Sequence, residues 1–134
     1  MEPLSQEVRY LIYVALWTLV LWIPYIVAHI GTVGLGRALS YEDHQPMPDW
    51  ARRLKGAHYN AVENLAPFAI VVISGEFIGL HTSLTSSCAV VYFVARLVHP
   101  FAMVIRVWGT RTLAFAVGWA ATIVYLFAVL FSGA

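Results

Sequence analysis

Four long apolar stretches divide the chain, and shorter polar stretches separate them. They cover about residues 8–36, 52–79, 84–107 and 110–131. Each exceeds the ~20 residues that an α-helix needs to cross ~30 Å of hydrocarbon. No stretch alternates apolar and polar residues in the way that membrane strands do. The pattern predicts an all-α integral membrane protein, a four-transmembrane-helix bundle formed by a single domain over residues 1–134.

Composition indicates that lipid is the main solvent of this chain. Hydrophobic residues make up 60% of the 134 positions and charged residues 11%, and the mean hydropathy is +0.75. A soluble protein of this length could not bury so much apolar surface. The net charge of +1, without a basic cluster interleaved with aromatic residues, gives no sign of nucleic-acid binding. The single cysteine, Cys88, lies in an apolar stretch and is expected to be a buried, inert thiol.

The connections between the predicted helices are short, with one exception. Residues 37–50 (RALSYEDHQPMPDW) contain two prolines and three acidic residues and are expected to form an exposed loop. Residues 80–83 and 108–110 are predicted tight turns, so the last three helices should be antiparallel neighbours. Pro24 and Pro67 are expected to kink the first and second helices.

Basic residues gather around the first and third connections. Six lie there, and only Arg9 lies at the opposite end: Arg37, Arg52, Arg53, Lys55, Arg106 and Arg111. Since positively charged loops remain in the cytoplasm, the first and third connections are predicted to be cytoplasmic and both termini to lie outside.

Two of the predicted helices carry polar residues at helical spacing. One face of the second helix holds Arg53, Gly56, Asn60, Glu63 and Pro67, and one face of the third holds Tyr92, Arg96, His99, Met103 and Arg106. Charged groups that face lipid cost several kcal/mol, so both faces are expected to point inward, towards each other or towards a water-filled cavity. Counting from the shared membrane surface places Glu63 level with Arg96 and Asn60 level with His99. This predicts an ion pair between Glu63 and Arg96.

The polar faces allow two interpretations. The Glu63–Arg96 pair could simply hold the bundle together. However, Asn64, Arg106 and Arg111 lie in the same half of the membrane, which one ion pair does not explain. An arginine-rich cavity that opens to the cytoplasm suits a small ligand with carboxylates, because the guanidinium group binds carboxylates through two hydrogen bonds. No spacing is typical of a zinc site, a Ser-His-Asp triad or a phosphate-binding loop, so no metal is expected.

Three segments resemble one known family. They are RLKGAHYNAVENLAPF (53–68), ARLVHPFAMVI (95–105) and GTRTLAF (109–115), and they resemble the MAPEG family, the membrane-associated proteins of eicosanoid and glutathione metabolism. The resemblance implies a homotrimer of four-helix subunits that holds glutathione, as a co-substrate, in clefts between subunits on the cytoplasmic side. It further implies a bacterial-type member in the inner membrane.

The resemblance also implies roles for particular residues. The expected glutathione-binding residues are Arg53, Asn60, Glu63, Tyr92, Arg96, His99 and Thr112, and Arg111 is the expected catalytic residue that stabilises the thiolate. Several family enzymes have an arginine where this chain has Gly56, so Arg53 or Lys55 would supply that charge. The eicosanoid enzymes have a tyrosine where this chain has Met103. These differences favour a generic member over an eicosanoid synthase.

The expected function is that of a glutathione transferase or peroxidase acting on lipophilic electrophiles dissolved in the bilayer. The expected partners are therefore membrane lipids, a hydrophobic small-molecule substrate and two further copies of the chain. One alternative is a non-catalytic protein that binds lipid or glutathione. Another is a small proton-coupled exporter that uses Glu63, which the predicted Glu63–Arg96 pair argues against because a carboxylate paired with arginine stays ionised.

Overall fold

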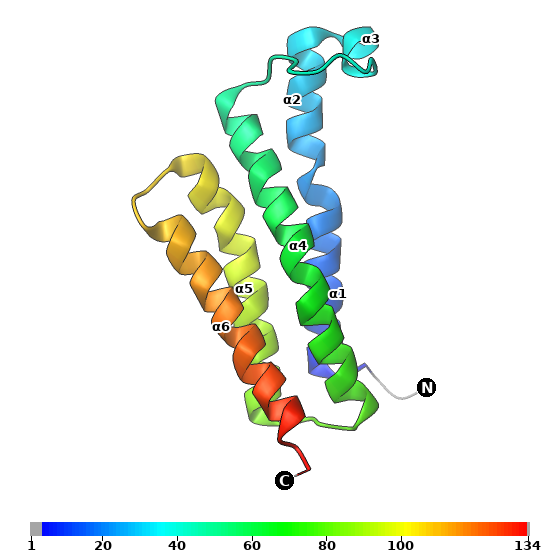
Figure 1. The fold of residues 1–134 in the computed structure, drawn as a ribbon, viewed down its shortest axis with the longest axis vertical. Coiled ribbons are helices and arrows are strands. Elements are labelled where there is room, and N and C mark those ends of the chain that lie inside the picture. Colours follow the sequence, from blue (N-terminus) through cyan, green and yellow to red (C-terminus); the bar gives the residue numbers. More distant parts are fainter. Residues whose placement is uncertain (1–3, 134) are drawn as a thin grey trace.

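The computed structural model describes residues 4–133, and these form helices without any strand. The helices are α1 (Gln6–Leu21), α2 (Ile23–Val33), α3 (Leu35–Ala38), α4 (Asp49–Phe77), α5 (Ser83–Ile105) and α6 (Thr110–Leu130). The long helices run along the longest axis of the molecule (Figure 1). Both termini and the α4–α5 turn lie at one end, and the α3–α4 and α5–α6 connections lie at the other. The all-α prediction is confirmed.

Within residues 4–133, three helical segments are long and apolar enough to cross a membrane. They are Gln6–Val33, Ser83–Ile105 and Thr110–Leu130. Together they support the prediction of an integral membrane protein. Helix α4 has 29 residues, but the charged residues in its first half lower its hydropathy. A fourth crossing by α4 therefore stays a prediction.

Proline positions explain where the first helix changes direction. The predicted helix over residues 8–36 is interrupted at Trp22, between α1 and α2, and ends at Gly34 before the single turn of α3. Pro24 has no amide hydrogen, and its ring crowds the carbonyl group four residues earlier, so the helix cannot continue undisturbed. The expected kink at Pro24 therefore takes the form of a one-residue break. Pro67 and Pro100 lie inside α4 and α5.

Pro100 leaves the carbonyl group of Arg96 without its usual helical donor. The indole N–H of Trp17 donates to that carbonyl oxygen at 3.1 Å. A side chain of α1 thus replaces the missing backbone donor of α5. This hydrogen bond connects the two helices at the level of Arg96.

The main hydrophobic core lies where α1, α4, α5 and α6 meet. Its centre is a stack of Phe68 on Tyr92, with ring centroids 3.6 Å apart. Tyr125 of α6 is fully buried against Gly75 of α4, where a Cβ atom would lie 2.8 Å from the tyrosine hydroxyl. The prediction that Cys88 is buried is confirmed.

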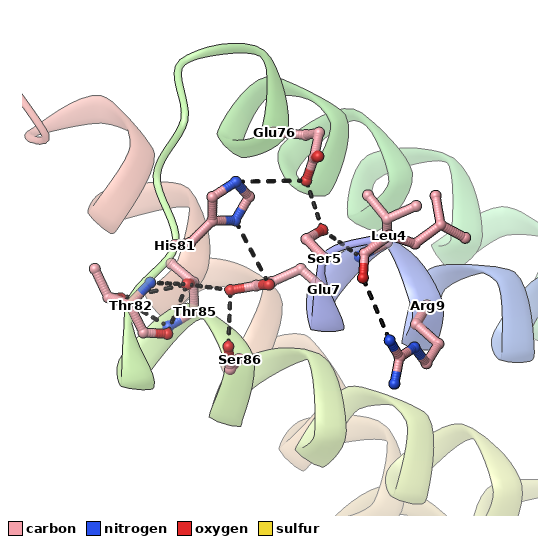
Figure 2. A network of polar contacts seen from close by, with 10 residues as sticks. Leu4, Ser5, Glu7, Arg9, Glu76, His81, Thr82, Thr85 and Ser86 are labelled. Carbon is pink, nitrogen blue, oxygen red and sulfur yellow. Dashed lines mark hydrogen bonds and ion pairs between the residues drawn. The ribbon is translucent and has the colours of Figure 1, made fainter. Parts of the chain in front are cut away.

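A polar cluster connects α1, α4 and α5 at the end of the molecule that holds the termini (Figure 2). Glu7 is only 2% exposed, and its carboxylate accepts hydrogen bonds from the hydroxyl groups of Thr85 at 2.6 Å and Ser86 at 2.9 Å. The imidazole of His81 lies between two carboxylates, 3.7 Å from Glu7 and 3.8 Å from Glu76. We call these five residues the Glu7 clasp. The sequence analysis did not identify it.

The loop predicted over residues 37–50 is shorter than expected. Helix α3 includes Arg37, and α4 begins at Asp49, where an acidic residue is favoured in the first turn of a helix. Arg37 donates two hydrogen bonds to the carboxylate of Glu42. These bonds hold the pKa of Glu42 below its usual value. Arg52 is similarly paired with Asp49 at 2.8 Å.

Candidate functional site

Two adjoining clefts lie among α4, α5 and α6, towards the end of the molecule that carries the α5–α6 connection. The smaller has a volume of 470 Å³ and is lined by Gly56, Tyr59, Asn60, Glu63, His99, Met103, Arg111, Thr112 and Phe115. The larger has a volume of 740 Å³ and is lined mainly by Arg53, Met103, Arg106, Trp108, Arg111 and Thr112. Because the two share Met103, Arg111 and Thr112, those three residues form the junction between them.

Arg96 lies directly behind the smaller cleft and is 2% exposed. Its Nη1 donates to the side-chain oxygen of Asn60 at 3.0 Å. Its Nε and Nη2 atoms are buried and have no hydrogen-bond partner among residues 4–133. A buried guanidinium group with two unpaired donors is costly, so this part of the structure favours negative charge nearby.

Aromatic rings and one glycine position the Arg96 guanidinium. It lies 5.0 Å from the centre of the Tyr92 ring and 5.7 Å from that of Phe115, within the range of cation–π attraction. Tyr92 is itself fixed by its hydroxyl group, which donates to the carbonyl oxygen of Asn64 at 2.9 Å. A Cβ atom on Gly118 would lie 3.4 Å from Arg96 Nε. Helix α6 therefore passes close to this group at Gly118, where a side chain larger than a methyl group would meet the guanidinium group.

The predicted alignment of α4 and α5 along the membrane normal agrees with the contact between Gly56 and Met103. The predicted ion pair between Glu63 and Arg96 is wrong. Gly56 faces Met103, as expected if Asn60 is level with His99 one turn further along. Glu63 and Arg96, both in the described part of the chain, form no ion pair, and Arg96 binds Asn60 instead. Glu63 therefore gives no reason to disfavour a proton-coupled exporter.

The rotation of α4 explains why Glu63 does not reach Arg96. Helix α4 turns Ala57, Ala61 and Phe68 into the core. At ~100° per residue, Asn60 lies about 100° from Ala61 around the helix, whereas Glu63 lies about 160° away. Glu63 is exposed on the subunit and lines only the open side of the smaller cleft. Asn60 of the polar face of α4 thus meets α5 directly, whereas Glu63 faces the cleft, the second of the two expected orientations.

Most of the expected site residues come together. Asn60, Glu63 and His99 line the smaller cleft, Arg53 lines the larger one, and Arg111 and Thr112 lie at the junction. Tyr92 and Arg96 line neither cleft but support the smaller one from behind. His99 is 4% exposed, so only a small part of its surface faces the cleft.

Three residues of the smaller cleft and its surroundings were not predicted from the sequence. Tyr59 and Phe115 line the smaller cleft, and Gly118 contacts the Arg96 side chain. Phe115 follows Arg111 by four residues, a spacing that places both on one face of a helix, so it could have been identified from the position of Arg111. Nothing in the sequence distinguishes Gly118 from other small residues of α6.

The charges around the clefts suit an anionic ligand. Arg37 and Arg52 are paired with Glu42 and Asp49, whereas the arginines of the clefts have no acidic partner in the part of the chain that the structure describes. Guanidinium groups bind carboxylates with two parallel hydrogen bonds. Glu63 provides one acidic group at the opening of the smaller cleft, which could bind a cationic group of the same ligand.

Comparison with known proteins identifies the family. The family model described as "MAPEG family" matches residues 10–131, nearly the whole chain. No curated protein and no solved structure gives a significant match. The matched range includes every residue of both clefts. The chain therefore belongs to the MAPEG family.

Proposed function

We propose that the protein is a glutathione-binding membrane enzyme, a transferase or peroxidase that presents the glutathione thiolate to lipophilic electrophiles. Membership of the MAPEG family supports this class of activity. The observation that carries the proposal is the smaller cleft, in which Asn60, Glu63, His99 and Arg111 meet. The uncompensated charge of Arg96 lies directly behind it.

The chemistry of glutathione fits these residues. Glutathione has two carboxylates, one ammonium group and one thiol, and the clefts offer arginines for the carboxylates and Glu63 for the ammonium group. Their volumes of 470 and 740 Å³ are within the range of small-ligand sites, roughly 300–1,000 Å³. We assign binding to Arg53, Asn60, Glu63, His99 and Thr112, and we assign Tyr92 and Arg96 a supporting role behind Asn60.

Arg111 is the proposed catalytic residue. It lies in the first turn of α6 and at the junction of the two clefts. A free thiol with a pKa of about 8.5 is mostly protonated at neutral pH, and a nearby guanidinium group favours the thiolate. The positive end of the α6 helix dipole acts in the same direction. When bound, glutathione supplies the sulfur nucleophile for an electrophile that arrives through the bilayer.

The proposal includes a homotrimer in which α4 also crosses the membrane. Gly56, Glu63 and Pro67 are exposed on the subunit, and a carboxylate that faces lipid costs several kcal/mol. A neighbouring subunit would cover this face and close the open side of the smaller cleft. Chemical cross-linking in membranes should then yield trimers. We further propose that the connections rich in basic residues face the cytoplasm and that the membrane is a bacterial inner membrane.

The thiolate of bound glutathione provides the direct test. Purified protein titrated with glutathione should develop the ultraviolet absorbance of a thiolate at neutral pH. Arg111→Ala should lose this signal and the conjugation of a chlorodinitrobenzene-type electrophile, and Arg111→Lys should retain part of both. Arg52→Ala is the matched control, because Arg52 is paired with Asp49 outside the clefts. Absence of the thiolate signal from the unmodified protein would contradict an enzymatic role.

A non-catalytic lipid- or glutathione-binding protein is the second candidate. The contact between Gly56 and Met103 favours it, since several family enzymes have an arginine in place of Gly56 and the eicosanoid enzymes have a tyrosine in place of Met103. In this chain that part of the cleft has only an apolar surface. Saturable binding of glutathione without thiolate absorbance and without conjugation would support this candidate.

A further inference from the structure

Arg106 adopts a backbone conformation that few residues with a side chain adopt. It ends α5 with φ 65° and ψ 31°, in the left-handed region. Of the residues that the structure describes, only His44 and Arg106 have a positive φ without being glycine. Glycine or asparagine is the usual residue at such a helix end. An arginine is unfavourable here, so its side chain requires a separate explanation.

No other side chain among the described residues holds the Arg106 guanidinium group in place. Among residues 4–133 it forms no side-chain hydrogen bond and no ion pair, whereas Arg37 and Arg52 at the same end of the molecule are paired. Arg106 instead lines the larger cleft together with Arg53 and Arg111. The Nε atom of Arg53 is buried and has no partner in the same described range. None of the described residues that line this cleft is acidic.

The two clefts differ in a way that matches the two ends of glutathione. The γ-glutamyl end has a carboxylate and an ammonium group, and only the smaller cleft contains an acidic residue, Glu63. The glycyl end has a carboxylate alone, and the larger cleft offers arginines alone. The cysteine between the two ends would then lie at the shared wall, beside Arg111.

We propose that Arg106 binds the glycyl carboxylate of glutathione in the larger cleft and makes the site selective for glutathione over thiols without that carboxylate. This inference rests on the proposed function. The strained backbone of Arg106 places a charge in the cleft at the end of α5. Glycine or asparagine, the residues that usually adopt this conformation, would supply no charge there. Strain of this kind is often retained at binding sites.

The test compares two ligands and several variants by calorimetry on the full-length protein in detergent. The ligands are glutathione and its glycyl monoethyl ester, in which an uncharged ethyl ester replaces the glycyl carboxylate. Arg106→Gly should bind glutathione about 10- to 100-fold more weakly, as expected for one lost charge-assisted contact, and should bind the ester as the unmodified protein does. Arg106→Asn, which also tolerates the left-handed region, should behave in the same way, and Arg106→Lys should retain part of the selectivity.

Each outcome of this test has a distinct meaning. Arg106→Gly should keep or raise the melting temperature, because glycine relieves the backbone strain, so a loss of glutathione affinity cannot then be attributed to misfolding. Arg52→Ala removes the same charge from the same end of the molecule and should leave both affinities unchanged. Binding of glutathione by the unmodified protein with no selective loss in Arg106→Gly and Arg106→Asn would overturn the inference alone. Failure of the unmodified protein to bind either ligand would overturn the proposed function as well.

Discussion

At the scale of single residues, contacts from α4, α5 and α6 surround the Arg96 guanidinium group. Its Nη1 atom binds Asn60, two aromatic rings face the guanidinium group, and α6 passes close to it at Gly118. The orientation of the Asn60 amide therefore depends on the position of Arg96. Since Asn60 lines the smaller cleft, residues that lie outside the cleft control its shape.

Substitutions at Gly118 test this control. A methyl group there would lie 3.4 Å from Arg96 Nε, an ordinary contact, so Gly118→Ala should fold normally and bind glutathione as before. Gly118→Leu should displace the guanidinium group, lower the free energy of unfolding by about 1–3 kcal/mol and weaken glutathione binding. Ala120→Leu, on an exposed part of the same helix, should change neither quantity. Thermal unfolding in detergent and calorimetry provide the measurements; normal binding by Gly118→Leu would refute the dependence.

At the scale of helices, a proline in α5 and a glycine in α4 each determine a contact with a neighbouring helix. Pro100 deprives the Arg96 carbonyl of its helical donor, and Trp17 of α1 supplies another. Gly75 of α4 provides space for the Tyr125 ring of α6. In the first case α1 supplies the hydrogen-bond donor that α5 lacks. In the second case the ring of α6 occupies the space that a side chain of α4 would fill.

A double-mutant cycle can measure the first compensation. Trp17→Phe leaves the Arg96 carbonyl without a donor and should lower the free energy of unfolding by about 1–3 kcal/mol beyond the loss of packing. In a Pro100→Ala background, the restored backbone N–H can donate to the same carbonyl, so Trp17→Phe should cost less there. The difference between the two backgrounds isolates the hydrogen bond from packing, which changes in both. Equal effects in both backgrounds would show that the indole does not replace the missing donor.

The contact between α4 and α6 leads to a second prediction at this scale. Gly75→Ala would place a methyl group 2.8 Å from the Tyr125 hydroxyl oxygen and should destabilise the protein by about 1–3 kcal/mol. The Tyr125 hydroxyl is buried without a partner among the described residues. Tyr125→Phe should therefore be neutral or stabilising and should recover part of the loss when combined with Gly75→Ala. Clear destabilisation by Tyr125→Phe alone would indicate that the hydroxyl group has a partner, such as a buried water molecule.

At the scale of the whole molecule, different features hold the two ends of the bundle together. The end near the termini is closed by the Glu7 clasp, in which a buried carboxylate connects α1 to α5 and His81 approaches both Glu7 and Glu76. The opposite end contains the two clefts and the unpaired arginines. The polar contacts that join α1 to α5 and the residues of the two clefts thus lie at opposite ends of the molecule.

The clasp can be tested with two adjacent serines. Ser86→Ala removes one of the two hydroxyl donors to the buried Glu7 carboxylate and should lower the free energy of unfolding by about 1.5–3 kcal/mol. Ser87 is exposed, and Ser87→Ala should stay within about 0.5 kcal/mol of the unmodified protein. Glutathione affinity should be unchanged in both variants, since the clefts lie at the other end. Similar stabilities for the two variants would show that the clasp contributes little.

The sequence by itself determined the helices, the membrane location and the family. Helical periodicity and apolar length depend only on local spacing, so they identified the long helices and the relative level of α4 and α5, as the contact of Gly56 with Met103 bears out. The motif residues also indicated in advance that Asn60, His99 and Arg111 would share one site.

Only the tertiary structure decided which of these side chains meet. Spacing along a helix sets the level of a residue, whereas the rotation of the helix is set by the packing of its buried face, here Ala57, Ala61 and Phe68. That rotation directs Asn60 towards Arg96 and leaves Glu63 on the open side. Contacts between distant segments, such as Trp17 with the Arg96 carbonyl and Glu7 with Thr85, depend on how all the helices pack together, which no local pattern specifies.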